Sequence, residues 1–161
     1  EAVRYRGVGS VSFLVDGTDA AWCIGLRPRI EIGTLLNDQV LGVKIPELQL
    51  RVAQGEPIGW TQQDLKPDGC ALGLRIRARS RGVLEALEVP DGDFATHLVP
   101  GAPATGLLGV LVIKAPTRQS AVVRASGALR RMVVRGVETD IEDHLHSLGE
   151  ASFWAGDVHE G

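Results

Sequence analysis

The chain has 161 residues, a mass of 17.2 kDa and a formal net charge of −3, from 17 basic and 20 acidic residues. This near balance gives no global electrostatic support for a nucleic-acid or membrane-surface partner, and the length favours one domain. Apolar residues make up 44% of the chain, which is enough for a hydrophobic core and argues against disorder. No apolar run is as long as a membrane span, and no signal peptide is visible.

The two cysteines, Cys23 and Cys70, both lie in apolar stretches. This placement favours buried free thiols in a reducing compartment over a disulfide framework. The cysteines and histidines show no spacing that is typical of a metal site. We therefore expect a cytoplasmic protein with no bound metal.

The first third of the chain predicts a β-hairpin followed by two helices. Residues 11–15 and 20–24 are apolar, and Asp16-Gly17 between them is a hairpin signal, so we expect two antiparallel strands with the second one buried. Helices are expected over 34–41 and 45–54, each ended by a glycine. The apolar face of the second helix predicts that it packs on a sheet.

The remaining two thirds predict several strands, one strand–helix unit and a final helix. Strands are expected over 70–79, 82–90, 94–99 and 107–113, a loop over 100–106, and helices over 117–134 and 140–148. On the first of these strands Arg75, Arg77 and Arg79 share one face, which is typical of a solvated face. The order of elements predicts an α+β fold with a largely antiparallel sheet packed with helices.

A group of charged residues directly follows the strand predicted over 20–24. Arg27, Arg29 and Glu31 alternate, so in an extended segment their side chains share one face. Such a group suits a polar pocket for an anion or another polar ligand. A solvated sheet edge with an Arg–Glu pair explains the same pattern, and that pair would contribute little stability. The residues alone leave both interpretations open.

Several short segments form a more specific pattern when they are taken together. They are Tyr5–Val11, Arg29–Ile32, Leu41–Val43, Leu48–Pro57, Arg75–Ile76, Ala115–Arg118, Ala128–Leu129, Gly136–Asp140, and Phe153 with Gly156. In this order they resemble the C-terminal half of biotin carboxylase, the ATP-grasp subunit of biotin-dependent carboxylases. The resemblance implies a single biotin-carboxylase-like domain over 1–161, in which 1–58 resembles the end of the ATP-grasp domain and 69–161 the C-terminal domain.

The chain departs from this family at positions that carry its chemistry. Where the family has two acidic metal ligands, the chain has Ser12 and Gly25, which cannot supply the charged oxygen ligands of a divalent cation. The glutamine that holds bicarbonate corresponds to Glu31, whose negative charge opposes a bound anion, and the catalytic glutamate corresponds to Gly33. The resemblance therefore implies a protein without ATP-dependent carboxylation and without a cofactor.

Two arginines that contact bicarbonate and biotin in the family correspond to Arg29 and Arg75, and both are retained. We therefore predict substrate binding by Arg27, Arg29 and Arg75, and catalysis by Glu31 with Arg29. The favoured hypothesis is a degenerate biotin-carboxylase-like pseudoenzyme that binds or converts a small organic metabolite of secondary metabolism, for instance as a cofactor-free cyclase.

Two alternatives stay open at this point. In the first alternative, the chain is a non-catalytic dimerisation or assembly module of a carboxylase complex. In the second, it is an excised fragment of a degenerate carboxylase with no activity of its own. The expected partners are accordingly a small-molecule ligand and a second copy or a carboxylase subunit, with no nucleic acid and no membrane.

Overall fold

The computed structural model describes residues 5–156 except for 17, 19 and 90–92. The chain divides into two compact units, Glu1–Lys66 and Pro67–Gly161. Every pair of neighbouring strands is antiparallel, and helices accompany the sheets, so the predicted α+β fold is confirmed. Among the described residues, no helix is both long and apolar enough to cross a membrane.

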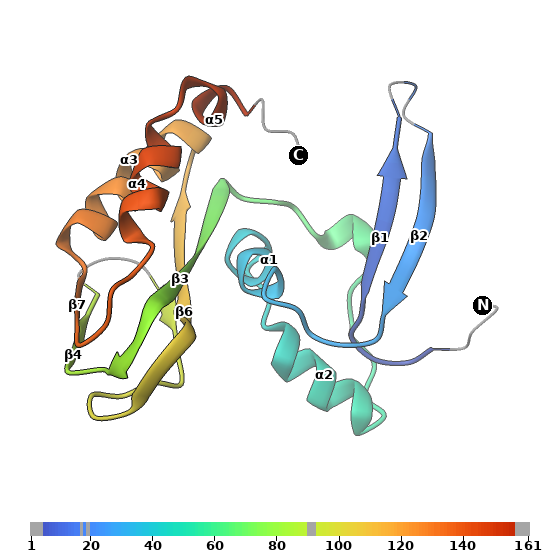
Figure 1. The fold of residues 1–161 in the computed structure, drawn as a ribbon. Helices are drawn as coiled ribbons and strands as arrows, with labels where there is room; N and C mark the ends of the chain where they lie inside the picture. The colour runs from blue at the N-terminus through green and yellow to red at the C-terminus, as the bar shows by residue number, and fades with distance from the viewer. Residues whose placement is uncertain (1–4, 17, 19, 90–92, 157–161) are drawn as a thin grey trace. The chain divides into compact units, whose positions relative to one another are not determined.

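The first unit consists of a two-stranded ribbon, two helices and a short 3-10 turn (Figure 1). Its elements are β1 (Ser10–Val15), β2 (Ala21–Arg27), α1 (Thr34–Leu41), α2 (Ile45–Ala53) and η1 (Gln62–Asp64). A β-bulge interrupts the pairing between Ser12 and Phe13. Helix α1 ends at Gly42, whose φ of 65° lies in the left-handed region that favours glycine.

The expected burial of this unit is wrong in two places. Every residue of β2 is exposed, including Trp22 and Cys23, which we expected in the core. Helix α2 has no buried residue, although its apolar face predicts packing on a sheet. Both errors have one physical cause, because an apolar pattern predicts which side chains favour burial but does not supply the layer that covers them.

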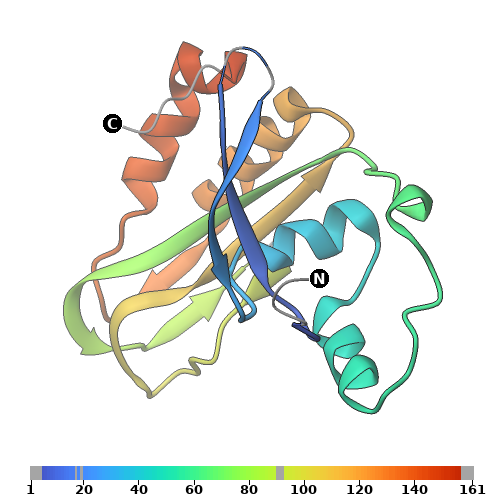
Figure 2. The same cartoon turned by 90° about the vertical axis from the view of Figure 1, so that its right-hand side faces the viewer.

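The second unit is built on a three-stranded sheet in the order β3-β6-β5, with a separate strand pair β4-β7. Its elements are β3 (Cys70–Val83), β4 (Ala86–Glu88), β5 (Asp93–Ala95), β6 (Pro103–Ala115), α3 (Arg118–Arg131), β7 (Val133–Arg135), α4 (Ile141–Gly149) and α5 (Ala151–Ala155). Figure 2 shows the long strands β3 and β6 running side by side. The core lies between this sheet and helix α3.

The core follows the sequence pattern closely. The buried stripe of α3 contains five small or medium side chains, Ala121, Val122, Ala125, Ala128 and Leu129, which allow the helix to approach the sheet. Strand β6 is central and buried along most of its length, as its apolar sequence predicts. Thr117 caps α3, since its side chain accepts a hydrogen bond from the Ser120 N–H at 3.2 Å.

Four element boundaries of this unit differ from expectation, each because a partner strand is present or absent. The strand predicted over 82–90 is divided between the end of β3 and β4, while residue 90 lies outside the described part of the chain. The helix predicted over 117–134 ends at Arg131, because Val133–Arg135 pairs with β4. The predicted loop over 100–106 joins β6 from Pro103 onward, and the strand over 94–99 is reduced to β5, which leaves His97 exposed beyond it.

The segment Gly136–Asp140 ties the end of β3 in place. The Arg77 N–H donates to Asp140 Oδ1 at 2.8 Å, and the Arg79 N–H donates to the Glu138 carbonyl at 2.8 Å. Gly136 has a φ of 95°, and a Cβ at this position would overlap the Val83 carbonyl oxygen. Asp140 precedes the first residue of α4, but its side chain makes no cap bond there, because its carboxylate accepts from β3 instead.

Candidate functional site

The predicted cluster forms at the point where the chain leaves β2. Pro28 has no N–H with which to continue a strand ladder, and the Arg29 N–H donates back to the Arg27 carbonyl at 2.8 Å. The chain therefore turns here, and the expectation of an extended segment with one charged face is wrong. The turn nevertheless brings the three side chains of Arg27, Arg29 and Glu31 together.

Glu31 accepts hydrogen bonds from both arginines through one carboxylate oxygen. Arg27 Nη1 lies 3.4 Å from Glu31 Oε1, and Arg29 Nε and Nη2 lie 3.3 and 3.2 Å from the same atom. The arginine side chains are 61% and 70% exposed, whereas that of Glu31 is 27% exposed. Ion pairs with this much solvent contact add little stability, so the fold does not depend on the cluster.

The cluster offers both donors and an acceptor at the surface. Two guanidinium groups and one carboxylate leave a local charge of +1, and most N–H groups of the two arginines are not engaged by Glu31. A ligand carboxylate can accept from these N–H groups in a bidentate manner. Glu31 Oε1 already accepts hydrogen bonds from both arginines. An incoming anion therefore competes with the Glu31 carboxylate for the same guanidinium groups.

The structure places Ser12 and Gly25 directly opposite each other in the β1–β2 ladder. Paired residues of this kind have their side chains on the same face of the ribbon. Ser12 offers one hydroxyl, Gly25 offers no side chain, and nothing lies within 4 Å of a Cβ built at Gly25. Within the described ranges, no group of three or more His, Cys, Asp or Glu side chains could hold a metal ion. These residues do not fit a divalent cation with its nucleotide.

Arg75 belongs to the second unit, on the exposed face of β3 that it shares with Arg77 and Arg79. Arg79 pairs with Asp143 of α4. The carbonyl of Arg75 accepts from His144 Nε2 at 3.1 Å, so this histidine contributes to holding β3. The structure thus brings Arg27, Arg29 and Glu31 together, whereas Arg75 lies in the other unit.

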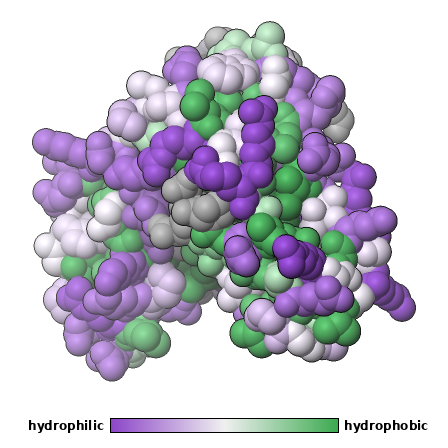
Figure 3. All heavy atoms as spheres, turned by 90° about the vertical axis from the view of Figure 1, so that its left-hand side faces the viewer, coloured by the Kyte–Doolittle hydropathy of each residue, from purple (hydrophilic) through white to green (hydrophobic). Residues whose placement is uncertain are grey.

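On one face of the molecule, hydrophilic and apolar residues are intermixed (Figure 3).

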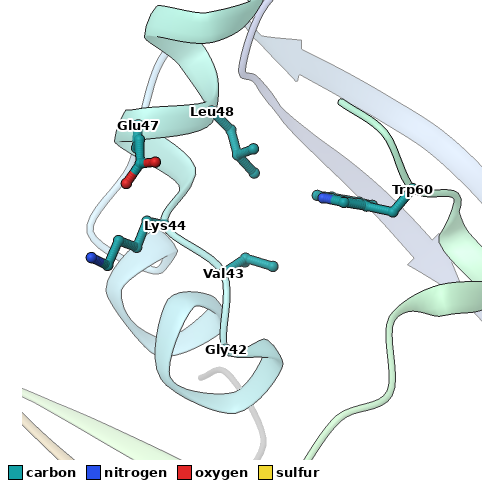
Figure 4. A pocket seen from close by; sticks show the side chains of 6 residues that line it. All are labelled: Gly42, Val43, Lys44, Glu47, Leu48 and Trp60. Carbon is teal, nitrogen blue, oxygen red and sulfur yellow. The ribbon is translucent and has the colours of Figure 1, made fainter. Parts of the chain in front are cut away.

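One pocket of the first unit was not predicted from the sequence. It has a volume of about 340 Å³ and is lined by Gly42, Val43, Lys44, Glu47, Leu48 and Trp60. In Figure 4 the side chains of Val43 and Leu48 and the Trp60 ring point toward the same space, while Lys44 and Glu47 lie on the side away from Trp60. The one sequence signal for it is Trp60, an aromatic residue in an otherwise polar connection.

Comparison with known proteins gives a consistent result, although no family model matches the chain. The biotin carboxylase of Halalkalibacterium halodurans is 26% identical, in an alignment that covers 98% of this chain and 38% of that protein. The chloroplastic biotin carboxylase 2 of Populus trichocarpa is 31% identical, with 98% of this chain and 33% of that protein covered.

The solved structures agree with these relatives. The biotin carboxylase subunit of pyruvate carboxylase has a TM-score of 0.90 and 28% identity, over 96% of this chain and 38% of that chain. The resemblance seen in the short sequence segments is therefore confirmed. The chain spans well under half of the length of the relatives that it matches.

Proposed function

This chain is a relative of the biotin carboxylases, and we propose that it does not carry out ATP-dependent carboxylation and that it binds a small organic metabolite at the Arg27–Glu31 turn. The observation that carries the proposal is the Glu31 carboxylate, which accepts hydrogen bonds from both Arg27 and Arg29. By the resemblance, Glu31 corresponds to the residue that holds bicarbonate in the family. We propose that the Glu31 carboxylate takes the place of that anion.

The missing metal ligands support the first half of this proposal. A nucleotide triphosphate is held through divalent cations, which need several hard oxygen ligands at close range. Ser12 and Gly25 face each other across the ribbon and bring no carboxylate to that place. Without charged ligands there, we expect no productive binding of magnesium and ATP.

The exposed arginines support the second half. A metabolite with a carboxylate would pair with Arg29, and a hydroxyl or amine on the same molecule would donate to Glu31. A ligand that draws the guanidinium groups away leaves the Glu31 carboxylate free to move a proton. Positioning together with one acid–base group is enough for a rearrangement such as a cyclisation, which needs no cofactor.

The remaining assignments stay predictions that rest on the resemblance. We propose that residues 1–58 correspond to the end of an ATP-grasp domain and that residues 69–161 correspond to a carboxylase C-terminal domain. Arg75 is proposed as a further ligand-binding arginine, because by the resemblance it corresponds to the second of the two arginines that contact bicarbonate and biotin in the family. Its exposed position on β3 leaves its guanidinium group accessible to a ligand.

The proposal is tested by calorimetric titration of the chain with magnesium-ATP and with three carboxylates, namely acetate, malonate and glutamate. We expect no heat with magnesium-ATP and saturable binding of at least one carboxylate. Arg29→Ala should weaken that binding roughly fivefold or more, as expected for the loss of a charged hydrogen bond. Arg51→Ala is the matched control, since Arg51 also forms an exposed ion pair, with Glu56 at 2.9 Å.

Binding of magnesium-ATP would contradict the first half of the proposal. Equal carboxylate affinity in Arg29→Ala and in the unchanged chain, or an equal loss in Arg51→Ala, would contradict the second half. Where a substrate is found among the carboxylates, unchanged turnover in Glu31→Gln would exclude Glu31 from catalysis.

A further inference from the structure

Strand β3 carries an arginine at every second position along its exposed face. Arg75, Arg77 and Arg79 share this face, and Arg81 continues the alternation, so that all four residues are exposed. Residues two apart on a strand are separated by about 6.7 Å, and the four positions therefore span roughly 20 Å. We call this set of four side chains the arginine row.

Most of the charge of the arginine row is not neutralised by the protein. Arg79 pairs with the Asp143 carboxylate. Within the described residues, the structure gives no side-chain partner to Arg75, Arg77 or Arg81. The one ion pair that is present shows that the row can bind a carboxylate, and three guanidinium groups remain available for further acidic groups.

The backbone beneath the arginine row is fixed by its own contacts. The N–H groups of Arg77 and Arg79 both donate to the segment 136–140. In return, the Glu138 N–H donates to Ser80 Oγ at 3.0 Å. These bonds use main-chain atoms and the serine hydroxyl, so they hold the strand while the guanidinium groups stay free. A surface that is ordered before it binds loses less conformational entropy on binding.

A bulge lies in the middle of the row. Between the pairs Ala78–Gly106 and Gly82–Ala104, the three residues 79–81 of β3 face a single residue of β6. A bulge bends its strand and changes the direction in which the side chains on it point. Two of the four arginines are in this bulge, where no partner residue of β6 fixes their direction.

Protection of an open sheet edge does not explain the arginine row. Charged residues on an outer strand commonly prevent pairing with another chain. Here β3 is paired with β6 on one side, and the N–H groups of Arg77 and Arg79 are already bonded on the other. Exposed ion pairs also contribute little to stability. The charge of the row is therefore better explained by recognition of an external anion.

The spacing of the row and its surroundings decide which anion fits. An extended peptide also places every second side chain on one face, about 6.7 Å apart, so a peptide with acidic residues at alternate positions matches the row. Single-stranded nucleic acid is another extended anion, but its bases are held by stacking on aromatic side chains. In the described part of the second unit, the large hydrophobic side chains that are exposed are all aliphatic, namely Val83, Val99, Leu107 and Val123.

We propose that the arginine row binds an extended acidic peptide segment of a partner protein, whose alternate acidic side chains pair with the arginines that Asp143 leaves free. This inference does not rest on the metabolite-binding proposal. The two share Arg75 alone, which the variants below leave unchanged, so either proposal can fail without the other.

The test is an NMR titration of the 161-residue chain with a short synthetic peptide in which glutamate and threonine alternate. A control peptide has the same number of glutamates at every third position, so that its acidic side chains alternate between faces when it is extended. A third probe is a single-stranded oligothymidylate that carries the same charge. All three titrations are made at low and at high NaCl concentration.

We expect the alternating peptide to bind at least about threefold more tightly than the control peptide, and to lose affinity at high salt. Arg77→Gln together with Arg81→Gln should weaken its binding about fivefold or more, because two exposed ion pairs are lost. Arg130→Gln together with Arg135→Gln is the matched control. It removes the same charge from two exposed arginines of the same unit that lie outside β3.

Equal affinity for the two peptides would overturn the proposal, because the row would then not recognise the spacing of the acidic groups. An equal loss of affinity in the two double variants would overturn it as well. Tighter binding of the oligothymidylate than of the alternating peptide would also overturn it and would assign the row to nucleic acid. In the unchanged chain, the alternating peptide should shift the amide signals of Ser80 and Gly82, and shifts confined to other segments would contradict the assigned surface.

Discussion

Replacing Glu31 by glutamine keeps the size of the side chain and removes the one negative charge of the Arg27–Glu31 cluster. The local charge then rises from +1 to +2, and both guanidinium groups become available to an external anion. One unit charge about 4 Å away contributes about 1 kcal/mol in a water-like dielectric and about 4 kcal/mol at an effective dielectric constant near 20. Because the two arginine side chains are 61% and 70% exposed, the lower value applies. It corresponds to roughly fivefold tighter binding of bicarbonate.

The assay is a bicarbonate titration of the unchanged chain and of Glu31→Gln, followed by NMR, at about 50 mM and about 500 mM NaCl. The gain in affinity should shrink at the higher salt concentration, because screening shortens the reach of the exposed charges. Glu56→Gln is the control, since it removes the acidic partner of Arg51 in the same unit without touching the cluster. Equal bicarbonate affinity in Glu31→Gln and the unchanged chain, or an equal gain in Glu56→Gln, would refute the reasoning.

Three further predictions concern other parts of the chain. Ser12→Glu together with Gly25→Glu places two carboxylates on one face of the ribbon, and we expect this double variant to bind Mn²⁺, as measured by paramagnetic relaxation. Absence of Mn²⁺ binding would show that two carboxylates alone do not restore a metal site. Gly136→Ala should cost about 3 kcal/mol in urea unfolding, because its φ of 95° is strained for alanine and the new Cβ overlaps backbone; a change near zero would contradict the described turn. The hydrogen bond and charge of Lys114 hold the pKa of Asp68 below 3.8, so the stability from this ion pair is present above that pH and is lost as the pH falls further. Asp68→Asn should therefore flatten the acid end of the curve of stability against pH. An unchanged acid end in this variant would show that the ion pair does not contribute to the pH dependence.

Much of the local structure was predictable from the sequence, because its signals act over a few residues. Asp16-Gly17 predicts the hairpin, Gly42 ends α1 in the left-handed conformation, and Thr117 begins α3 with its own side chain. The alternation of Leu74 and Ile76 with the arginines of β3 also predicts the buried and exposed faces of that strand correctly. In these places the turn geometry, the capping bond or the period of two is decided by neighbours along the chain.

The candidate site was predictable in its members but not in its geometry. The sequence alone identified Arg27, Arg29 and Glu31 as a group that follows a strand and shares one face if the segment is extended. The structure has a turn at Pro28 instead, where the Arg29 N–H returns to the Arg27 carbonyl and both arginine side chains reach one carboxylate oxygen. Side-chain convergence at a turn depends on backbone angles that no period of two or 3.6 residues encodes.

Burial and long-range pairing were decided by the tertiary structure. Trp22 and Cys23 have the sequence of a core strand, yet Trp22 is 50% exposed and Cys23 is exposed as well. Asp140 has the sequence of a helix cap, yet its carboxylate accepts the Arg77 N–H of a strand 63 residues earlier in the chain. By itself the sequence determines which side chains share a face and where the chain turns, since those depend on adjacent residues. Which faces meet depends on the layers available to cover them, and that is settled only by contacts between distant segments.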